Sequence, residues 1–377
     1  MIKPVIFLEI LKKNGVDFFT GVPDSLLKDI CLCIENNVKK EKHIIAANEG
    51  AAIGLAVGHY LATERISLVY MQNSGLGNSV NPLTSLADED VYGIPMLLMI
   101  GWRGEPDFPD ESQHKKMGKV TLNLLDAIGV PYVILSDDPK ETEILVSKAL
   151  SLAVERTGPV AIIVRKNVFS GYLPALKEEN LFFNLSREKA VEIILGQCGE
   201  NDVIVSTTGK LSRELFELRE KNNQLHSQDF LTVGSMGHAS QIALGISLED
   251  KKRVICLDGD GAMIMHLGSL ATCGVYAPTN FLHIVLNNGC HESVGGQPTL
   301  GFNIDLPKIA EACGYKYTGR VEGEDDLLKT LEKILSVKGP VFLEVRLNKS
   351  SRSDLGRPTK TPQENKLAFV NFLKNKI

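Results

Sequence analysis

Long hydrophobic segments are missing from this chain of 377 residues. The longest apolar run, Ile94 to Ile100, contains a proline and falls far short of the roughly 20 residues needed to span a bilayer. The N-terminus, Met1-Ile2-Lys3-Pro4, lacks the apolar core of a signal peptide. We therefore expect a cytoplasmic protein that has no membrane partner.

An excess of positive charge is missing as well. The 41 basic and 46 acidic residues give a net charge of −5, so the field of the whole protein repels nucleic acid. The seven cysteines are odd in number, and neither Cys31-Leu32-Cys33 nor the five scattered ones show the spacing of a zinc or thioredoxin motif. They are typical of reduced cytosolic thiols, and we expect no nucleic-acid partner.

The composition is that of an ordinary globular protein. Hydrophobic residues make up 44% of the chain and charged residues 23%, which excludes a disordered or collagen-like chain. At roughly 150 residues per domain, the length predicts two domains, possibly three.

Short apolar runs rich in branched residues alternate with segments of helical period. This alternation is typical of parallel sheets covered by helices, so we expect an α/β fold of doubly wound parallel sheets. The expected strands are apolar on both faces, as buried parallel strands must be. They are Ser67 to Gln72, Pro95 to Ile100, Tyr132 to Leu135, Val160 to Arg165, Val203 to Ser206, Val254 to Asp258, Leu282 to Asn287 and Val341 to Leu347. Further strands are expected at His43 to Ala46 and after Ala312-Cys313-Gly314.

An internal repeat indicates two related halves. Gly158-Pro159-Val160 recurs as Gly339-Pro340-Val341, a shift of 339 − 158 = 181 residues. A Gly-Pro-Val triplet before a buried strand is common in α/β proteins, so the motif alone leaves duplication and coincidence open. With duplication, we expect a first domain over residues 1–170, a linker over 171–185 and a second domain over 186–377.

The sharpest local motif is Asp258-Gly259-Asp260-Gly261, which follows an expected strand and precedes an expected helix from Ala262 to Cys273. Glycines let the backbone approach an anion closely, and a helix N-terminus favours negative charge. Asp260 adds an oxygen ligand of the kind that Mg²⁺ uses beside phosphates. A plain strand-to-helix turn is the alternative for this motif taken by itself.

Asn287-Asn288 follows the next expected strand. Neighbouring parallel strands end at the same sheet edge, so Asp260 and Asn288 can meet at one metal in the crevice where open α/β sheets bind ligands. Gly-Asp-Gly followed after slightly under thirty residues by Asn-Asn resembles the fingerprint of thiamine diphosphate enzymes. Ala47-Asn48-Glu49-Gly50 resembles the segment that carries their cofactor-activating glutamate, and Gly234-Ser235-Met236-Gly237 resembles the loop that props the cofactor in a bent shape.

The resemblance implies two domains of the thiamine diphosphate-binding fold, a pyrimidine-binding half and a diphosphate-binding half, without the middle domain of longer relatives. It implies thiamine diphosphate and Mg²⁺ as cofactors, and a homodimer or higher oligomer with active sites between subunits. Asp260, Asn288 and the carbonyl of Cys290 would bind the metal. The implied cofactor-binding residues are Glu49, Gly209, Gly234, Ser235, Met236, Gly259, Asp260, Gly261, Ala262 and Asn288.

Within the family, the chain resembles the decarboxylases of phosphonopyruvate, with those of sulfopyruvate next. The supporting stretches include Gly21 to Leu27, Gln72 to Asn78 and His291 to Thr299. The implied reaction turns 3-phosphonopyruvate into phosphonoacetaldehyde and CO₂ in phosphonate biosynthesis. Such a dianionic substrate needs cationic donors, which arginine supplies through its forked N–H groups. The candidates are Arg103, Lys210, Arg352 and Arg357.

Two further residues have a catalytic and a structural interpretation. His114 lies where relatives carry a proton-transferring histidine pair, although this chain has a single histidine there, and it could equally be a solvent-exposed loop residue. Asp24 resembles a family acid near the reacting carbon, although the local spacing differs by one residue, and it could instead cap a helix starting at Ser25.

Two alternative functions remain open at this point. One is decarboxylation of sulfopyruvate or another small 2-oxo acid. The other is a non-catalytic nucleotide- or phosphate-binding α/β protein. A nicotinamide dehydrogenase fits less well, because Gly75-Leu76-Gly77 lacks the third glycine and the downstream acid of a dinucleotide fingerprint.

Overall fold

The computed structural model describes residues 1–173 and 183–374. Most of the expected linker, 171–185, therefore lies outside the described residues. The chain separates into two compact units: the first holds residues 1–173 with His291–Gln297, and the second holds residues 183–290 and 298–374. No helix in the described ranges is long and apolar enough to cross a membrane.

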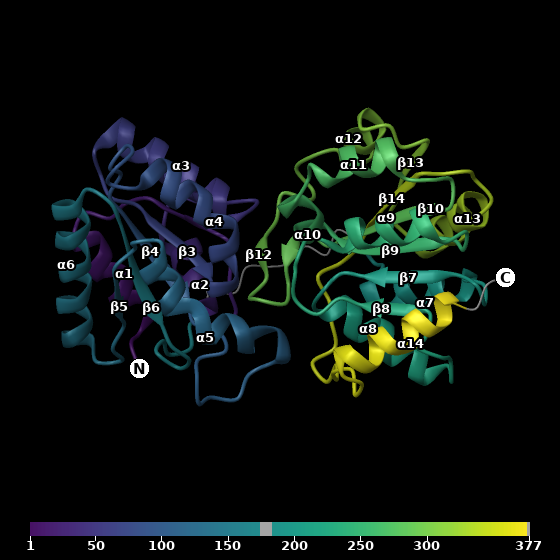
Figure 1. The fold of residues 1–377 in the computed structure, drawn as a ribbon, viewed down its shortest axis with the longest axis horizontal. Coiled ribbons are helices and arrows are strands. Elements are labelled where there is room, and N and C mark those ends of the chain that lie inside the picture. The colour runs from purple at the N-terminus through teal and green to yellow at the C-terminus, as the bar shows by residue number, and fades with distance from the viewer. Residues whose placement is uncertain (174–182, 375–377) are drawn as a thin grey trace. The chain divides into compact units, whose positions relative to one another are not determined.

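The first unit is built on a six-stranded parallel sheet in the order β2-β1-β3-β4-β6-β5 (Figure 1). The strands are β1 (Phe19–Gly21), β2 (His43–Ile45), β3 (Leu68–Gln72), β4 (Met96–Gly101), β5 (Tyr132–Ile134) and β6 (Pro159–Val164). Its helices are α1 (Pro4–Lys13), α2 (Lys28–Asn37), α3 (Glu49–Thr63), α4 (Leu76–Pro82), α5 (Ser112–Ala127) and α6 (Pro139–Arg156).

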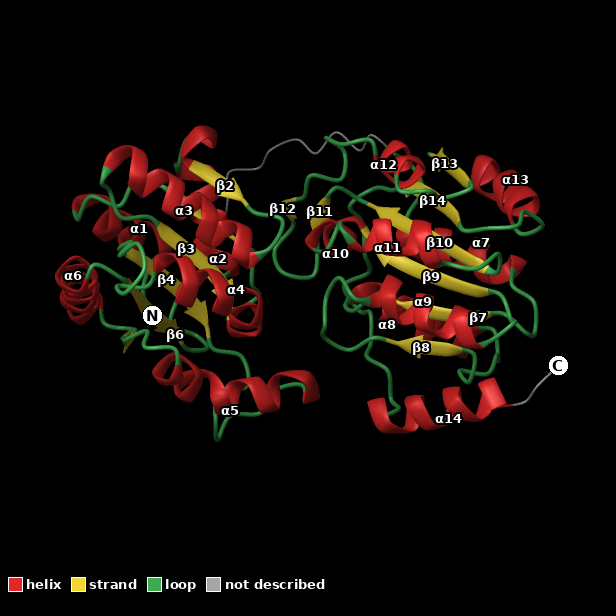
Figure 2. Ribbon diagram, turned by 45° about the horizontal axis from the view of Figure 1, so that its top comes forward, coloured by secondary structure: helices red, strands yellow, loops and turns green. Residues whose placement is uncertain are grey.

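The second unit contains a second parallel sheet, in the order β13-β14-β10-β9-β7-β8 (Figure 2). Its strands are β7 (Val203–Ser206), β8 (Asp229–Leu231), β9 (Val254–Gly259), β10 (Phe281–Asn287), β13 (Tyr317–Val321) and β14 (Val341–Arg346). Its helices are α7 (Arg187–Gln197), α8 (Lys210–Lys221), α9 (Ala239–Glu249), α10 (Asp260–Met265), α11 (Ser269–Tyr276), α12 (Leu306–Ala312), α13 (Glu324–Ile334) and α14 (Pro362–Lys374). Two short strands, β11 (Cys290–His291) and β12 (Gln297–Pro298), lie outside both large sheets.

The two sheets have the same topology. When the strands of each large sheet are numbered from one within their own unit, both read 2-1-3-4-6-5. Gly158-Pro159-Val160 and Gly339-Pro340-Val341 lead into equivalent strands, β6 and β14, the last of each sheet along the chain. The expected fold class, two related doubly wound α/β domains without a middle domain, is confirmed.

Each sheet has a hydrophobic core on both faces, because successive residues of a strand point to opposite faces. In the first unit, Leu97 and Met99 pack with α1, α2 and α6, while Leu98 and Ile100 pack with α3, α4 and α5. β4, β6 and β10 are buried along their full length. Polar side chains that could bind a ligand are therefore expected at the ends of these strands.

The structure corrects three details of the sequence interpretation. The helix expected from Ala262 to Cys273 is two helices, α10 and α11, separated at His266 to Gly268. β1 and β8 were not expected, and each is only three residues long. Both also contain a residue that is rare in strands, Gly21 in β1 and Asp229 in β8, whereas the equally short β5, Tyr132-Val133-Ile134, was expected.

The burial of His43 should make the stability of the first unit depend on pH. Burial lowers the pKa of this imidazole, whose Nε2 lies 2.8 Å from the hydroxyl of Tyr70, to about 4. As the pH falls below about 6.5, the imidazole of His43 binds a proton in the unfolded state but stays neutral in the folded state. Stability should therefore fall between about pH 6.5 and 4, by on the order of 3 kcal/mol for this group.

Trp102, the single tryptophan of the chain and 8% exposed, makes denaturant unfolding of this unit measurable by fluorescence. His43→Gln should flatten the loss of stability on acidification, whereas His238→Gln, in the second unit, should not. An unchanged pH slope in His43→Gln would contradict the assignment.

Candidate active site

The Gly-Asp-Gly turn and the Asn-Asn pair lie side by side at the carboxyl end of the second sheet. β9 and β10 are hydrogen-bonded neighbours in parallel register, with Gly259 opposite Leu286. Asp260 and Asn287 each follow these paired positions by one residue. The carboxylate of Asp260 also accepts the backbone N–H of Asn288. The expected meeting of these two motifs at one sheet edge is therefore present.

Asp260 is a buried carboxyl group, 2% exposed. Burial raises the pKa of Asp260 to about 6, and the hydroxyl of Thr299, which donates to Oδ2, partly offsets that rise. Because burial raises this pKa, a cation beside the carboxylate would stabilise its ionised form.

Gly301 leaves space beside the carboxylate of Asp260 and the amide oxygen of Asn287. A methyl group on Gly301 would lie 2.6 Å from Oδ2 of Asp260 and 2.5 Å from Oδ1 of Asn287, too close for either atom to stay in place. Asn287 is held by its own amide, which donates to the carbonyl of Gly301 and to Glu344 at 2.8 Å each. A carboxylate, an amide oxygen and a backbone carbonyl are the hard oxygen ligands that suit Mg²⁺. The donor set therefore fits that metal.

Asn288 and Cys290 complete this turn. Asn288 is 4% exposed and its Oδ1 accepts the backbone N–H of Cys290 at 3.2 Å. Gly289, between them, has φ +67, and a methyl group there would collide with the ring of Phe302. The tight turn thus joins Cys290 to Asn288, whose backbone N–H donates to the carboxylate of Asp260.

The loop at residues 234–237 packs against the start of α10. Gly234, Ser235 and Gly237 all have positive φ, and Met236 at its tip is half-buried. A methyl group on Gly237 would lie 2.9 Å from the carbonyl of Ala262, so only glycine lets the two segments approach. Thr208, next to Gly209, accepts the backbone N–H of Gly234. Gly209, Gly234 to Met236, and Gly259 to Ala262 thus belong to neighbouring segments of one unit.

Glu49, in the first unit, opens α3 and is 5% exposed. Asn48 caps the helix by accepting the N–H of Ala51 at 2.8 Å. The side chain of Asn78 donates to Oε2 of Glu49 at 2.7 Å. Gly75 lies so close that a methyl group on it would be 2.5 Å from Cγ and Oε1 of Glu49. The carboxylate is therefore held in one place by an amide and a glycine.

A second buried acid, Asp24, lies beyond the end of β1. It is 0% exposed, and burial raises its pKa although the side chain of Gln72 donates to it at 2.6 Å. Oδ2 accepts the N–H of Leu26, and α2 begins only at Lys28. The alternative that Asp24 caps a helix starting at Ser25 is therefore wrong.

Arg103 follows β4 and is already engaged by its own unit. Nε and Nη2 donate to the two carboxylate oxygens of Asp110 at 2.8 and 2.6 Å, and Nη1 donates to the hydroxyl of Ser25. A guanidinium has five N–H donors, so 5 − 3 = 2 have no hydrogen-bond partner among the residues that the structure describes. Arg103 also interacts electrostatically with Asp24, which brings the two candidates together.

His114 lies in the first turn of α5 and is half-buried, so the alternative of a solvent-exposed loop residue is wrong. Burial, reinforced by the charge of Arg103, lowers the pKa of His114 to about 4. The imidazole is therefore neutral at physiological pH and binds a proton less readily than an ordinary histidine. Gly104 permits this packing, because a methyl group there would strike the carbonyl of His114.

The remaining cationic candidates belong to the second unit. Lys210, at the start of α8, donates to the hydroxyl of Ser351. Arg352 pairs with Glu188, Glu217 and Asp354 at the surface, so its charge is already matched by carboxylates. Arg357 is exposed. These three belong to the second unit, whereas Asp24, Arg103 and His114 belong to the first.

Sequence reasoning missed the residues that hold the candidates in place. Asn78 orients Glu49, Gln72 contacts Asp24, Asp110 binds Arg103 and Thr299 contacts Asp260. Gln72 and Asn78 stand in a stretch that carried the family resemblance, which was the available signal for them. Asp110 had no such signal.

Comparisons with known proteins agree with this arrangement. Residues 5–133 match the N-terminal TPP binding domain of thiamine pyrophosphate enzymes, and residues 207–345 match their C-terminal TPP binding domain. The chain is 34% identical over 373 residues to the phosphonopyruvate decarboxylase of Streptomyces viridochromogenes, covering 95% of this chain and 92% of that protein.

Sulfopyruvate decarboxylases are similar as well. That of Methanosarcina acetivorans is 26% identical over 388 residues, covering 97% of this chain and 96% of that protein. The sulfopyruvate decarboxylase subunit alpha of Methanococcus maripaludis is 39% identical over 152 residues, covering 40% of this chain and 87% of the subunit.

The packing of Glu49 against Gly75 predicts a large effect of one methyl group. Gly75→Ala should destabilise the first unit by about 1–3 kcal/mol, the usual cost of overpacking. Gly77→Ala is the matched control, because nothing lies within 4 Å of its added methyl group and alanine favours helix α4. Denaturant unfolding followed by Trp102 fluorescence measures both.

In the Glu49→Ala background, Gly75→Ala should cost much less stability than it does in the wild type, because the side chain that the added methyl group would strike is gone. Additive losses in this cycle would show that the two residues do not press on one another.

Proposed function

The chain belongs to the thiamine pyrophosphate enzyme family and is a decarboxylase, and we propose that it releases CO₂ from 3-phosphonopyruvate to give phosphonoacetaldehyde, with thiamine diphosphate and Mg²⁺ as cofactors. The observation that carries the substrate is the match, along nearly the whole chain, to a phosphonopyruvate decarboxylase. A role in phosphonate biosynthesis follows from that substrate.

The second unit supplies a site suited to a metal and a diphosphate. We assign the metal to Asp260, Asn288 and the carbonyl of Cys290, supported by the buried carboxylate and the space that Gly301 leaves. Gly209, Gly259, Gly261 and Ala262 offer backbone N–H groups to the diphosphate. Gly234, Ser235 and Met236 form the loop that packs beside them, with Met236 as the apolar support.

When bound, thiamine diphosphate supplies the electron sink for the electron pair left by CO₂. Glu49 is assigned as the carboxylate that binds the pyrimidine ring and exchanges a proton with it. Its burial and its hydrogen bond from Asn78 support this role, because a fixed carboxylate in a dry site holds a proton at a defined atom.

The cluster at the end of the first sheet is assigned to the substrate. Arg103 has two N–H donors to spare and is fixed by Asp110, which suits it to an anionic oxygen. Asp24, whose pKa is raised by burial, holds a proton more readily than an ordinary aspartate. His114 is neutral and lies near the charge of Arg103, so it is assigned as a hydrogen-bonding group beside the substrate. Lys210, Arg352 and Arg357 remain weaker candidates, since Arg352 is occupied by three carboxylates.

We also propose that the protein works as a homodimer or a higher homo-oligomer. The support is that the family places its cofactor between the two kinds of domain from different subunits. Sedimentation equilibrium of the purified chain tests this, and a monomer at working concentration would rule it out.

Removing the charge of Glu49 should separate binding from turnover. Glu49→Gln should keep Mg²⁺-dependent binding of thiamine diphosphate and lose at least about 100-fold in kcat, the usual range for a proton-transferring group. Calorimetric titration and CO₂ release measure the two effects. Glu155→Gln, an exposed glutamate of α6, is the control and should behave as wild type.

Full activity in Glu49→Gln would refute the role of this residue. Absence of Mg²⁺-dependent thiamine diphosphate binding by the wild-type protein would instead favour a non-catalytic phosphate-binding protein.

Substrate choice is tested by comparing kcat/KM for phosphonopyruvate, sulfopyruvate and pyruvate. Phosphonopyruvate should be preferred, and Arg103→Lys should raise its KM about 10-fold or more, because a lysine cannot replace a forked guanidinium. Arg352→Lys should change KM little. Preference for sulfopyruvate would overturn the substrate assignment and leave the decarboxylase intact.

A further inference from the structure

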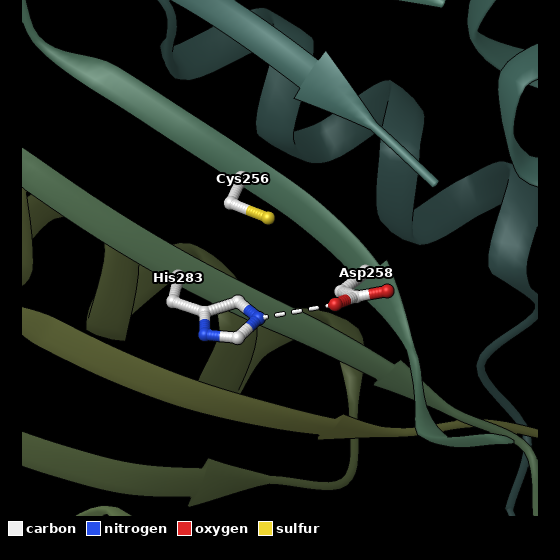
Figure 3. A group of neighbouring side chains, drawn as sticks. All are labelled: Cys256, Asp258 and His283. Carbon is white, nitrogen blue, oxygen red and sulfur yellow. Dashed lines mark ion pairs between the residues drawn. The ribbon is translucent and has the colours of Figure 1, made fainter. Parts of the chain in front are cut away.

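A cluster of polar side chains lies buried inside the second unit, beneath the turns described above. Cys256 and Asp258 point from β9 and His283 points from β10, toward one another (Figure 3). Cys256 and Asp258 are two residues apart on one strand and so share a face, and His283 is the register partner of Cys256. The sulfur, one carboxylate oxygen and one ring nitrogen all lie within 4.8 Å of one another.

The burial of this cluster leaves polar atoms without hydrogen bonds. All three side chains are 0% exposed. Oδ2 of Asp258 and Nε2 of His283 have no hydrogen-bond partner in the part of the chain that the structure describes, and they face each other at 3.5 Å. Leaving such groups unsatisfied in the interior costs on the order of 1–3 kcal/mol each. A bound ion that contacts both atoms would remove that cost.

We propose that Cys256, Asp258 and His283 bind one zinc-class divalent transition metal ion. A thiolate, a carboxylate oxygen and an imidazole nitrogen are the three ligand types that zinc takes in proteins. Magnesium prefers oxygen ligands alone, so this site differs in chemistry from the one around Asp260. The proposal does not depend on the function proposed above.

Outer contacts already orient two of the three ligands as metal sites require. Oδ1 of Asp258 accepts the N–H of Gly259 at 2.9 Å, which leaves Oδ2 for the metal. Nδ1 of His283 lies 3.2 Å from the hydroxyl of Tyr315, so a proton on Nδ1 leaves the lone pair of Nε2 free to bind. Tyr315 is linked in turn to Cys273 on α11, and Gln241 donates to the same sulfur.

Zinc sites usually have four ligands, of which these side chains supply three; the sulfur of Cys273, on α11, is already bound by Tyr315 and Gln241. Its thiol lies near enough to interact electrostatically with both Cys256 and Asp258. A metal at this place would tie β9 to β10 shortly before the turns that carry Asp260 and Asn288. The ion would thereby fix the spacing of those two turns, which is a structural role.

The test measures metal content of the full chain, expressed without a polyhistidine tag in zinc-supplemented medium and dialysed against EDTA. Because the site is closed to solvent, the wild-type protein should keep one zinc per chain by elemental analysis, while exchangeable magnesium is lost. His283→Gln and Cys256→Ser should lose it. Cys33→Ser, which removes a buried thiol from the first unit, should retain it.

Refolding the wild-type protein with Co²⁺ keeps the proposal testable if those variants fail to fold. A sulfur-to-cobalt charge-transfer band should appear in wild type and in Cys33→Ser. Wild-type protein that holds no zinc and shows no such band overturns the proposal, as does a band that persists in a folded Cys256→Ser variant. Neither measurement uses enzyme activity, so failure here is distinct from failure of the proposed function.

Discussion

Parallel strands that are covered by helices on both faces leave polar chemistry only at their ends. β4 and β10 are buried along their whole length, so any polar side chain in mid-strand must find a partner inside the protein. The candidate residues accordingly follow strands: Asp24 after β1, Arg103 after β4 and Asp260 after β9. The same constraint makes the mid-strand group of Cys256, Asp258 and His283 unusual, since it has no access to water.

Close approach of the backbone is the second condition on which both candidate sites depend. Glycines stand where a side chain would displace a functional group: Gly75 beside Glu49, Gly101 beside Asp24 and Gly301 beside Asp260. At each position an added methyl group would lie within 2.6 Å of a carboxylate oxygen of the acid. The glycines therefore define where each carboxyl group can be, and neighbouring amides or hydroxyls then fix its direction.

The architecture was largely predictable from sequence because strands buried on both faces have a strong apolar signal. Ten strands were expected close to where they lie, for example Val203–Ser206, and the repeated Gly-Pro-Val motif pointed to the duplication that the two sheet topologies confirm. β1 and β8 were missed because each has only three residues and includes one that is rare in strands, Gly21 and Asp229 respectively. The break between α10 and α11 at His266 was missed because the apolar period continues across it.

The functional groups could be recognised from the sequence alone: a Gly-Asp-Gly turn, an Asn-Asn pair, a glutamate at a helix start and no recognisable zinc spacing among the cysteines. The contacts between these groups could be seen only in the folded structure. Thr299 reaches Asp260 across 39 positions of the chain, Arg103 reaches Ser25 across 78, and Cys256 meets His283 because two strands pair in one register. Such contacts depend on strand order and side-chain packing, which leave no mark in local periodicity.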